Sequence, residues 1–483
     1  MAFDNLPFED RVRQDDAMSS TEAPRPGHDR KQLSPFDATM LVMGGIIGVG
    51  IFFAPQTAAR LIPETLPFLL LWIGGGVIAM CGALTFAEWG GSLPKAGGWF
   101  VFLAAAFGPF LAFLFAWVIL GVVSTGALAV IAAFGASQIA ELGIGIGPSG
   151  TTSHLLVAAA FILSLTAIVL GGIKLGATVQ NVCMLTKLIA ILALAVGGLA
   201  FFAPGSAPAP MLPPADPAPT NLLGNLPAAL LAVFFSYGGW QHLCYVAPAL
   251  RDPRRTLPRA IVLGVALVIV TYVLVNVAYV RVLGMDGLAS TPNFAAECAR
   301  RTFGPRAATA LAGVMAVSAF GVCAVNIIVS PAIYVAMARD GLFFRSFARL
   351  HPRTGAPVLA LLLQCVITLL YLLWAHASAG NPKPPPDSHS FHMDIDALIT
   401  SVVFAEWFFH AAIAWGLLRI RKTRPDLPRP FKSPLWPLAP VLYLATAALV
   451  LIGNVWSSQP SVTLLGLGVL ALGGVVYQAW KRF

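Results

Sequence analysis

The sequence predicts an all-α polytopic membrane protein with twelve transmembrane helices. Of its 483 residues, 58% are hydrophobic and 11% are charged, and the mean hydropathy is +0.80. A soluble protein of this size carries about 25% charged residues, so most of this chain has no water to face. Apolar runs of about 20 residues, the length that crosses a bilayer, recur twelve times. Glycines interrupt the first and the sixth run.

The twelve runs follow one another along almost the whole chain. They lie at 36–60, 66–89, 100–138, 154–172, 175–203, 223–249, 258–282, 306–338, 356–376, 395–419, 434–454 and 461–480. The runs at 100–138 and 306–338 are longer than one crossing needs. Each is either one tilted helix with an interfacial extension or a span with an added surface helix.

The distribution of positive charge orients the chain. With the N-terminus inside, most of the 30 lysines and arginines fall on the cytoplasmic side, as the positive-inside rule requires. We therefore predict a multi-pass protein of the cell inner (cytoplasmic) membrane with both termini in the cytoplasm. The net charge of +9 follows from this topology and gives no indication of nucleic-acid binding. The first 35 residues have no signal-peptide core and are predicted to form a disordered cytoplasmic tail.

Two spans contain sequences that do not favour a continuous helix. One is GGIIGVG at 44–50, and the other is Tyr237–Trp240, YGGW, in the middle of the sixth span. In hydrocarbon, non-helical backbone is tolerated only where protein or a water-filled cavity receives its polar groups. The alternative is that these glycines serve close helix packing. Two interruptions at matching places in two five-span units favour the substrate site of a secondary transporter.

The chemistry of an interrupted helix indicates the ligand. The second half of such a helix begins with free N–H groups and the positive end of a helix dipole, which attract a carboxylate. The first half ends in free carbonyls, which suit an ammonium group. A carboxylate and an amine together describe an α-amino acid. Gly48 and Gly50 would let the ligand reach the backbone without an intervening Cβ.

Five stretches carry a family resemblance. GGIIGVGIF resembles the first-span signature of the amino acid–polyamine–organocation (APC) superfamily, particularly of its L-type amino acid transporter branch. The other stretches similar to this branch are FFSYGGWQHLCYVAPALRDPRRTLPRAI, FAEWGGSLPKAGG at 86–98, AMARDGLFFRSFARLHPRTGAPVLALLLQ at 336–364 and RPDLPRPFKSPLWPLAP at 424–440. They occur in the order expected for the family.

The resemblance implies the LeuT-type fold, an inverted repeat of five plus five helices in which helices 1 and 6 are broken. The chain then divides into a cytoplasmic tail (1–35), a first five-helix repeat (36–203), a second five-helix repeat (223–420), and two additional transmembrane helices with a short cytoplasmic C-terminus (434–483). The expected activity is secondary active transport of amino acids by alternating access, either as an exchanger (antiporter) or as a proton-coupled permease.

The resemblance also assigns the substrate site. It implies that the substrate carboxylate lies on the backbone of Gly48, Val49 and Gly50. The amine would face carbonyls near Ile46, Phe235, Ser236 and Gly238, and Phe235 falls where the branch places an aromatic lid. Without the resemblance, Phe235 reads as an ordinary core aromatic. The family commonly has serine where this chain has Val49, so a hydroxyl donor is lost while backbone recognition remains.

Lys187 lies well inside the fifth span, where a cation costs several kcal/mol and marks a candidate functional residue. The family resemblance implies that its ammonium occupies the place where sodium-coupled relatives hold a sodium ion, which predicts sodium independence. The alternative is a lysine that snorkels to the membrane surface.

Three further residues are candidates for coupling or gating. Glu406 is a buried acid on the tenth span, with His410 one helical turn later; the pair either shares a proton or braces the scaffold. Glu88, at the inner end of the second span, is predicted to act as a gate or loop brace beside Lys95 or the cluster around Arg251. Trp240 flanks the second interruption.

The substrate side chain is predicted to be small to medium and neutral. Spans three, six and eight contain no acidic residue, and span one has only Asp37 at its start, so a cationic amino acid lacks a counter-charge unless Glu406 reaches it. Ser124, Thr125 and Asn326 are predicted to line the pocket. The alternatives are a cationic amino acid or polyamine transporter and a transporter-like nutrient sensor. A channel and an enzyme are not expected, because neither pore rings nor a catalytic set is present.

No cofactor, metal or covalent partner is expected. The six cysteines show no paired spacing. His389 and His392 fit no zinc pattern and lie in a proline-rich loop. Animal members of the branch join a heavy chain through a cysteine between spans three and four. The loop ELGIGIGPSGTTSH at 141–154 has none, so a disulfide-linked heavy chain is not expected.

Overall fold

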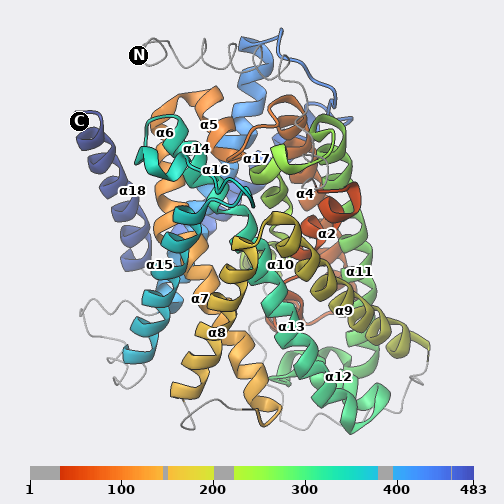
Figure 1. The fold of residues 1–483 in the computed structure, drawn as a ribbon. Coiled ribbons are helices and arrows are strands. Elements are labelled where there is room, and N and C mark those ends of the chain that lie inside the picture. The colour runs from red at the N-terminus through yellow and green to blue at the C-terminus, as the bar shows by residue number, and fades with distance from the viewer. Residues whose placement is uncertain (1–32, 145–150, 201–221, 379–394, 458–459, 483) are drawn as a thin grey trace.

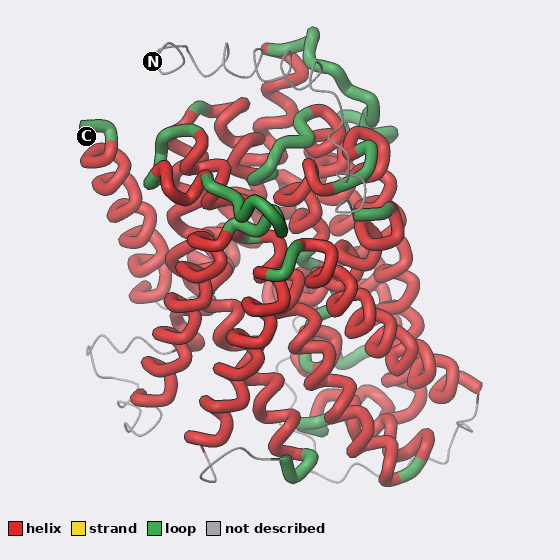
Figure 2. Tube along the Cα trace, in the orientation of Figure 1, coloured by secondary structure: helices red, strands yellow, loops and turns green. Residues whose placement is uncertain are grey.

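A computed structural model describes residues 33–144, 151–200, 222–378, 395–457 and 460–482. Helices and their connections make up these ranges, and no strand forms within them (Figure 2). Seven of the described helices are long and apolar enough to cross a membrane, which agrees with the predicted multi-pass membrane protein. Most of the predicted N-terminal tail, residues 145–150 and the loop with His389 and His392 lie outside the described ranges.

The helices run mostly along one direction of an elongated bundle (Figure 1). Their order is α2 (Pro35–Ile46), η2 (Gly50–Phe52), α3 (Ala54–Leu61), α4 (Thr65–Ser92), α5 (Trp99–Phe107), α6 (Pro109–Val118), η3 (Ile119–Val123), α7 (Ser124–Glu141), α8 (Thr151–Leu170), α9 (Ile173–Ala200), α10 (Leu222–Tyr237), η4 (Trp240–Ala249), α11 (Pro253–Ser290), α12 (Phe294–Phe303), α13 (Pro305–Val329), α14 (Pro331–Arg339), η5 (Arg345–Ala348), α15 (Val358–Ser378), α16 (Ile395–Thr423), α17 (Leu438–Ser457) and α18 (Pro460–Trp480).

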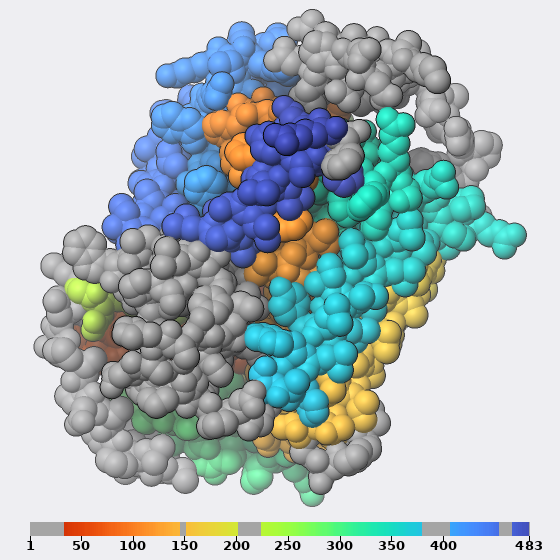
Figure 3. Space-filling model, turned by 90° about the vertical axis from the view of Figure 1, so that its left-hand side faces the viewer, coloured from red at the N-terminus to blue at the C-terminus, as the bar shows by residue number. Residues whose placement is uncertain are grey.

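The outer helices present apolar side chains on the molecular surface. On α4 the exposed residues Leu66, Leu70, Ile73 and Val77 recur every three or four positions, so they form one stripe along the helix. The outer helix α15 packs against α8, and Figure 3 shows the two side by side at the surface. Exposed apolar stripes of this kind suit a lipid environment.

The two overlong runs are resolved in different ways. In the run 100–138, Gly108 has a φ of 89° and separates α5 from the following helix. Most of α5 is buried, from Trp99 onward, so it is not a surface helix. In the run 306–338, helix α13 passes into α14 at Ser330, and the two form one apolar stretch of 35 residues.

The first interrupted segment begins with a well-defined cap. Ser34 and Asp37 form a capping box, and Pro35 occupies the first helical turn of α2. The Asp37 carboxylate also accepts a hydrogen bond from Asn181 Nδ2 at 2.8 Å and pairs with Lys174, which ties this end of α2 to α9. The α-helix ends at Ile46, and the chain resumes as the short turn η2 before α3.

The second interrupted segment ends its α-helix at Tyr237. Gly239 has a φ of 117°, a conformation that L side chains rarely adopt, and the chain continues as the 3₁₀ helix η4. A Cβ on Gly239 would lie 2.2 Å from the Gly45 carbonyl oxygen. The two segments therefore cross with their backbones in contact.

A second attachment joins the same two segments at the Ser34 end of α2. Leu33 N donates to the Ala249 carbonyl at 2.7 Å, and Arg251 N donates to the Leu33 carbonyl at 3.1 Å. These bonds form an isolated parallel β-bridge between Leu33 and Leu250. The start of α2 and the end of η4 are thus held together by backbone hydrogen bonds.

Glu88 forms a brace, but with Arg421 and not with the expected Lys95 or Arg251 cluster. Its carboxylate is fully buried and accepts two hydrogen bonds from Arg421, at 2.6 and 2.5 Å, from the end of α16. Ser433 N donates a further bond at 2.8 Å. Among described residues the partners of Glu88 lie at the end of α16 and in the segment that follows it. The expectation of Lys95 or the Arg251 cluster is wrong, because this end of α16 lies against the carboxylate instead.

We predict that Glu88→Gln lowers the stability of the protein. Removing one member of a buried ion pair leaves the Arg421 charge uncompensated, at a cost of about 3–5 kcal/mol. The thermal midpoint of the purified protein in detergent, followed by tryptophan fluorescence, should fall clearly. Glu141→Gln makes the same chemical change at an exposed site and should stay within about 0.5 kcal/mol; equal midpoints for both variants would contradict the brace.

Candidate functional site

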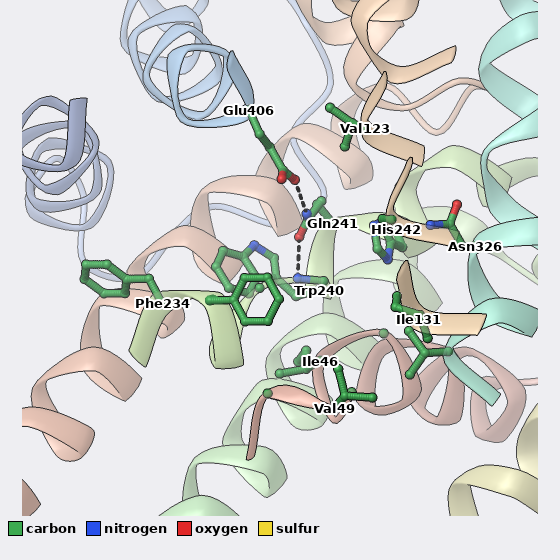
Figure 4. Close-up of a pocket in the computed structure, with 18 of the residues that line it drawn as sticks. Ile46, Val49, Val123, Ile131, Phe234, Trp240, Gln241, His242, Asn326 and Glu406 are labelled. Carbon is green, nitrogen blue, oxygen red and sulfur yellow. Dashed lines mark hydrogen bonds between the residues drawn. The ribbon is translucent and has the colours of Figure 1, made fainter. Parts of the chain in front are cut away.

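A cavity of about 460 Å³ lies where the two interrupted segments meet. Residues of η2, α7, α10, η4, α13 and α16 line it together with the end of α2 (Figure 4). The predicted site residues that line it are Ile46, Gly48, Val49, Gly50, Ser124, Phe235, Gly238, Trp240, Asn326 and Glu406. The predicted residues outside the lining are Glu88, Thr125, Lys187 and Ser236.

One side of the cavity presents backbone donors. In the described part of the chain, the amides of Val49, Gly50 and Ile51 donate no hydrogen bond, because η2 begins here and its first bonds come from Phe52 and Phe53. Three successive free N–H groups at the start of a helical turn are suited to an anion.

Gly50 is a cavity-lining position where an added side chain does not fit. A Cβ there would lie 2.9 Å from Ser236 Oγ and 3.1 Å from Ser236 Cα. At Gly48 the nearest atom to an added Cβ is Val322 Cγ2, at an ordinary contact distance of 3.7 Å. The requirement for glycine at Gly50 therefore comes from the close approach of α10.

Tyr272 connects the two interruptions. Its hydroxyl, on α11, lies 3.2 Å from the Ile46 carbonyl oxygen and 3.1 Å from that of Ser236. Both are carbonyls that lose their helical partner at an interruption. The tyrosine thus fixes the geometry of the two segments. The Ser236 carbonyl has a second lone pair and keeps acceptor capacity for a ligand, whereas the Ile46 carbonyl also accepts from Gly48 N at 2.8 Å.

The Phe235 carbonyl is left without its helical partner because the Gln241 side chain takes the hydrogen bond from Gly239 N. In a continuous helix it would accept from Gly239 N, but this amide donates to Gln241 Oε1 at 3.0 Å. The Phe235 ring is 50% exposed and packs on Phe53, with 5.6 Å between ring centroids. The two aromatic rings form one wall of the cavity.

Lys187 holds the end of α2. It is fully buried, so it does not snorkel, and its ammonium donates to the Ile47 carbonyl, with the Gly44 carbonyl at 3.4 Å. A cation at the C-terminal end of a helix also interacts favourably with the helix dipole. Lys187 therefore stabilises the interruption from behind and does not line the cavity.

Ser124 and Asn326 belong to a hydrogen-bonded group on the opposite wall. Ser124 Oγ donates to Asn326 Oδ1 at 2.7 Å, and Gln364 Nε2 donates to Ser124 Oγ at 3.0 Å. Ser330 Oγ also donates to Asn326 Oδ1 at 2.7 Å. Thr125 instead donates to the Leu120 carbonyl at 3.0 Å, within the π-helical turn η3, and lies outside the lining.

Glu406 reaches the cavity from α16. Gln241 Nε2 donates to Glu406 Oε1 at 3.4 Å, and His410 Nε2 lies 3.9 Å from the same oxygen. The second distance is too long for a hydrogen bond. His410 instead bonds through Nδ1 to the Tyr443 hydroxyl. In Figure 4, Glu406 and Val49 lie on opposite sides of the cavity, with Gln241 between them.

The amino-acid sequence matches a known family over almost its whole length. The family model described as amino acid permease covers residues 33–472. The chain belongs to the amino acid permease family. This confirms the resemblance to the APC superfamily.

Two relatives place this permease close to the L-type branch. It is 28% identical to the b(0,+)-type amino acid transporter 1 of Mus musculus over 97% of this chain and 91% of the relative. It is 30% identical to the large neutral amino acids transporter small subunit 2 of Homo sapiens, over 93% of this chain and 80% of the relative. The permease is therefore a member of an amino acid transporter family that spans membranes.

Several residues of the permease site could not be identified from sequence. Tyr272 and Gln241 make the contacts that shape the interruptions, and His242 and Phe53 line the cavity. Tyr272 stands in an apolar run that resembles any core helix. Gln241 offered one signal, since a polar side chain directly after an interruption within a membrane span needs a partner.

We predict that Gly50→Leu abolishes amino acid binding by the permease, because the added side chain collides with Ser236 and displaces η2 from α10. Gly74→Leu is the matched control, since a Cβ on Gly74 meets nothing within 4 Å. Binding measured by competition against a labelled amino acid should be lost in the first variant and kept in the second. Val49→Ser should keep binding, since its backbone amide is unchanged. Normal binding by Gly50→Leu would contradict the close-approach argument.

We predict that Lys187→Met destabilises the permease, because buried carbonyls at the end of α2 lose their donor. Each unsatisfied group costs about 1–3 kcal/mol. The thermal midpoint in detergent should fall well below that of Lys422→Met, which removes a lysine at an exposed position. Equal midpoints would show that the Lys187 ammonium does not stabilise the interruption.

Proposed function

We propose that this permease is a secondary active transporter of α-amino acids that works by alternating access. The observation that carries the proposal is the cavity at the two interruptions, with free amides on one side and carbonyls on the other. The amides of Val49, Gly50 and Ile51 would bind the substrate carboxylate. The carbonyls of Ile46, Phe235, Ser236 and Gly238 would face its amine, and Phe235 would close over the substrate.

The proposed topology has twelve spans, in the order α2–α3, α4, α6–α7, α8, α9, α10–η4, α11, α13–α14, α15, α16, α17 and α18. The interrupted segments are then first and sixth, as a five-plus-five inverted repeat of the LeuT type requires. The repeats would comprise 36–203 and 223–420, followed by two additional helices in 434–483. Both termini would lie in the cytoplasm, with the protein in the inner membrane.

We propose that transport is independent of sodium. The Lys187 ammonium already lies on the carbonyls of Ile47 and Gly44, which are the kind of oxygen ligands that an alkali cation uses. A fixed internal cation removes the need for a bound one. Energy would then come from exchange of amino acids or from protons.

We propose neutral amino acids of small to medium size as substrates. The cavity walls are mainly apolar, with Ile119, Val123 and Ile131 on one side and Phe234 and Leu231 on another. One relative is named for large neutral amino acids, which agrees with an apolar side-chain pocket. The alternative of a cationic substrate depends on Glu406.

We also propose that the permease works without a disulfide-linked partner. The name of one relative describes it as a small subunit. All six cysteines of this chain are free and buried, so none is positioned on the surface for a bond to another chain.

The test is uptake of labelled amino acids by purified protein in liposomes. We expect uptake that is stimulated by unlabelled amino acid inside or by an inward proton gradient, and that is unchanged when sodium is replaced by choline. Uptake that requires a sodium gradient would overturn sodium independence. Binding without flux would identify a sensor, and flux that neither gradient nor counter-substrate drives would indicate a channel.

A further inference from the structure

The Glu406 carboxylate is partly open to the cavity and has no strong partner among the described residues. Its side chain is 29% exposed, and its residue belongs to the cavity lining. The contacts of Oε1 are long, at 3.4 Å to Gln241 Nε2 and 3.9 Å to His410 Nε2. No described residue donates to Oε2. Half of the carboxylate is therefore available to a ligand.

The described neighbours of Glu406 include no lysine or arginine. Within the described chain, the titratable side chains that face it are His410 on α16, His242 and Tyr245 on η4, and Tyr443 on α17. His410 is held by Tyr443 through Nδ1, and the Trp99 ring packs on it at 4.6 Å. This leaves no lysine or arginine of the described residues in contact with the carboxylate.

The other elements packed against α16 also place no lysine or arginine of the described residues beside Glu406. Helices α5 and α6 and the turn η3 carry no titratable side chain. Glu88 on α4 is paired with Arg421, which lies about 22 Å along α16 from Glu406 at 1.5 Å per residue. Tyr477 on α18 packs on Phe110 and Phe113. Glu406 is thus an isolated acid.

An isolated carboxylate in a largely apolar cavity is costly unless it binds a proton or a cation. One side chain, Gln241, connects Glu406 to the interruptions along the cavity. Gln241 Oε1 accepts from Gly239 N and its Nε2 contacts Glu406, while Gly239 touches Gly45 of the first segment. A substrate held by its α-groups at the interruptions therefore has Glu406 within reach of its side chain.

We propose that Glu406 binds the positively charged end of a dibasic amino acid, an ammonium or a guanidinium group, an inference that rests on the proposed function of the site. When the cavity is empty or holds a neutral amino acid, the carboxylate carries a proton. When a dibasic substrate binds, this proton leaves to the water on the open side and the substrate cation takes its place. The charge within the site is the same in both states, so one pocket accepts neutral and dibasic substrates.

The test compares lysine with norleucine, which has the same linear side chain but no terminal ammonium. The purified protein in liposomes is assayed for binding by competition of each compound against labelled norleucine. For the native sequence, the affinity for lysine relative to norleucine should rise as the pH is raised from about 5 to about 8, because fewer protons compete for Glu406.

Glu406→Gln should lower the affinity ratio of lysine to norleucine by about 10- to 100-fold, the effect of losing a charged hydrogen-bond partner, and should remove its pH dependence. Residual norleucine binding shows that the variant is folded. Glu406→Asp keeps the charge and should restore part of the ratio. Glu64→Gln, the same change at an exposed position, should leave the ratio unchanged.

Two results would overturn the inference alone: norleucine binding without lysine competition at any pH, or a ratio that Glu406→Gln leaves within about twofold. Failure of the native protein to bind any amino acid would overturn the proposed function itself, and this inference with it. The two failures are therefore distinguishable in one assay.

Discussion

The structure depends on the contact between the backbones of Gly45 and Gly239. Two helices that stop within the membrane expose amides and carbonyls, and such groups need partners where water is scarce. These segments touch without side chains between them. The same neighbouring residues can therefore form hydrogen bonds with the free backbone groups of both segments. The Tyr272 hydroxyl lies within hydrogen-bond distance of a carbonyl of each segment, and Lys187 donates to the Ile47 carbonyl at the end of the first. Among the described residues, Val49 and Gly50 carry unpaired amides and line the cavity.

The two buried charges near the cavity, Lys187 and Glu406, have different surroundings. Lys187 lies behind the interruption, where carbonyls and the negative end of the α2 dipole surround it. Glu406 lies across the cavity and has only weak contacts. The lysine is therefore satisfied by the protein itself, whereas the glutamate is not. A fixed cation stabilises the fold, and an unsatisfied anion is the group that a ligand can use.

The interruptions could be predicted from sequence because glycine clusters within apolar runs have few explanations. Their partners could not. Tyr272 looks like any aromatic residue of a buried helix until α11 is known to pass both breaks. Thr125 and Ser124 are adjacent in sequence, yet only Ser124 lines the cavity, because the π-helical turn η3 decides which of them faces it. Glu88 was expected to act as a brace, but its partner lies 333 residues away in sequence.

The bridge between Leu33 and Leu250 has a mechanical consequence. With the Gly45–Gly239 contact, it attaches α2 to η4 at two points. Two helical segments that are attached at two points move together as one rigid body. Any movement that opens the cavity from this end must therefore move both α2 and η4. The segments that would bend are then residues 47–49 and 238–239, and Gly48, Val49, Gly238 and Gly239 also line the cavity. A molecule bound there would lie on the hinge itself, and the stiffness of the hinge would depend directly on its presence.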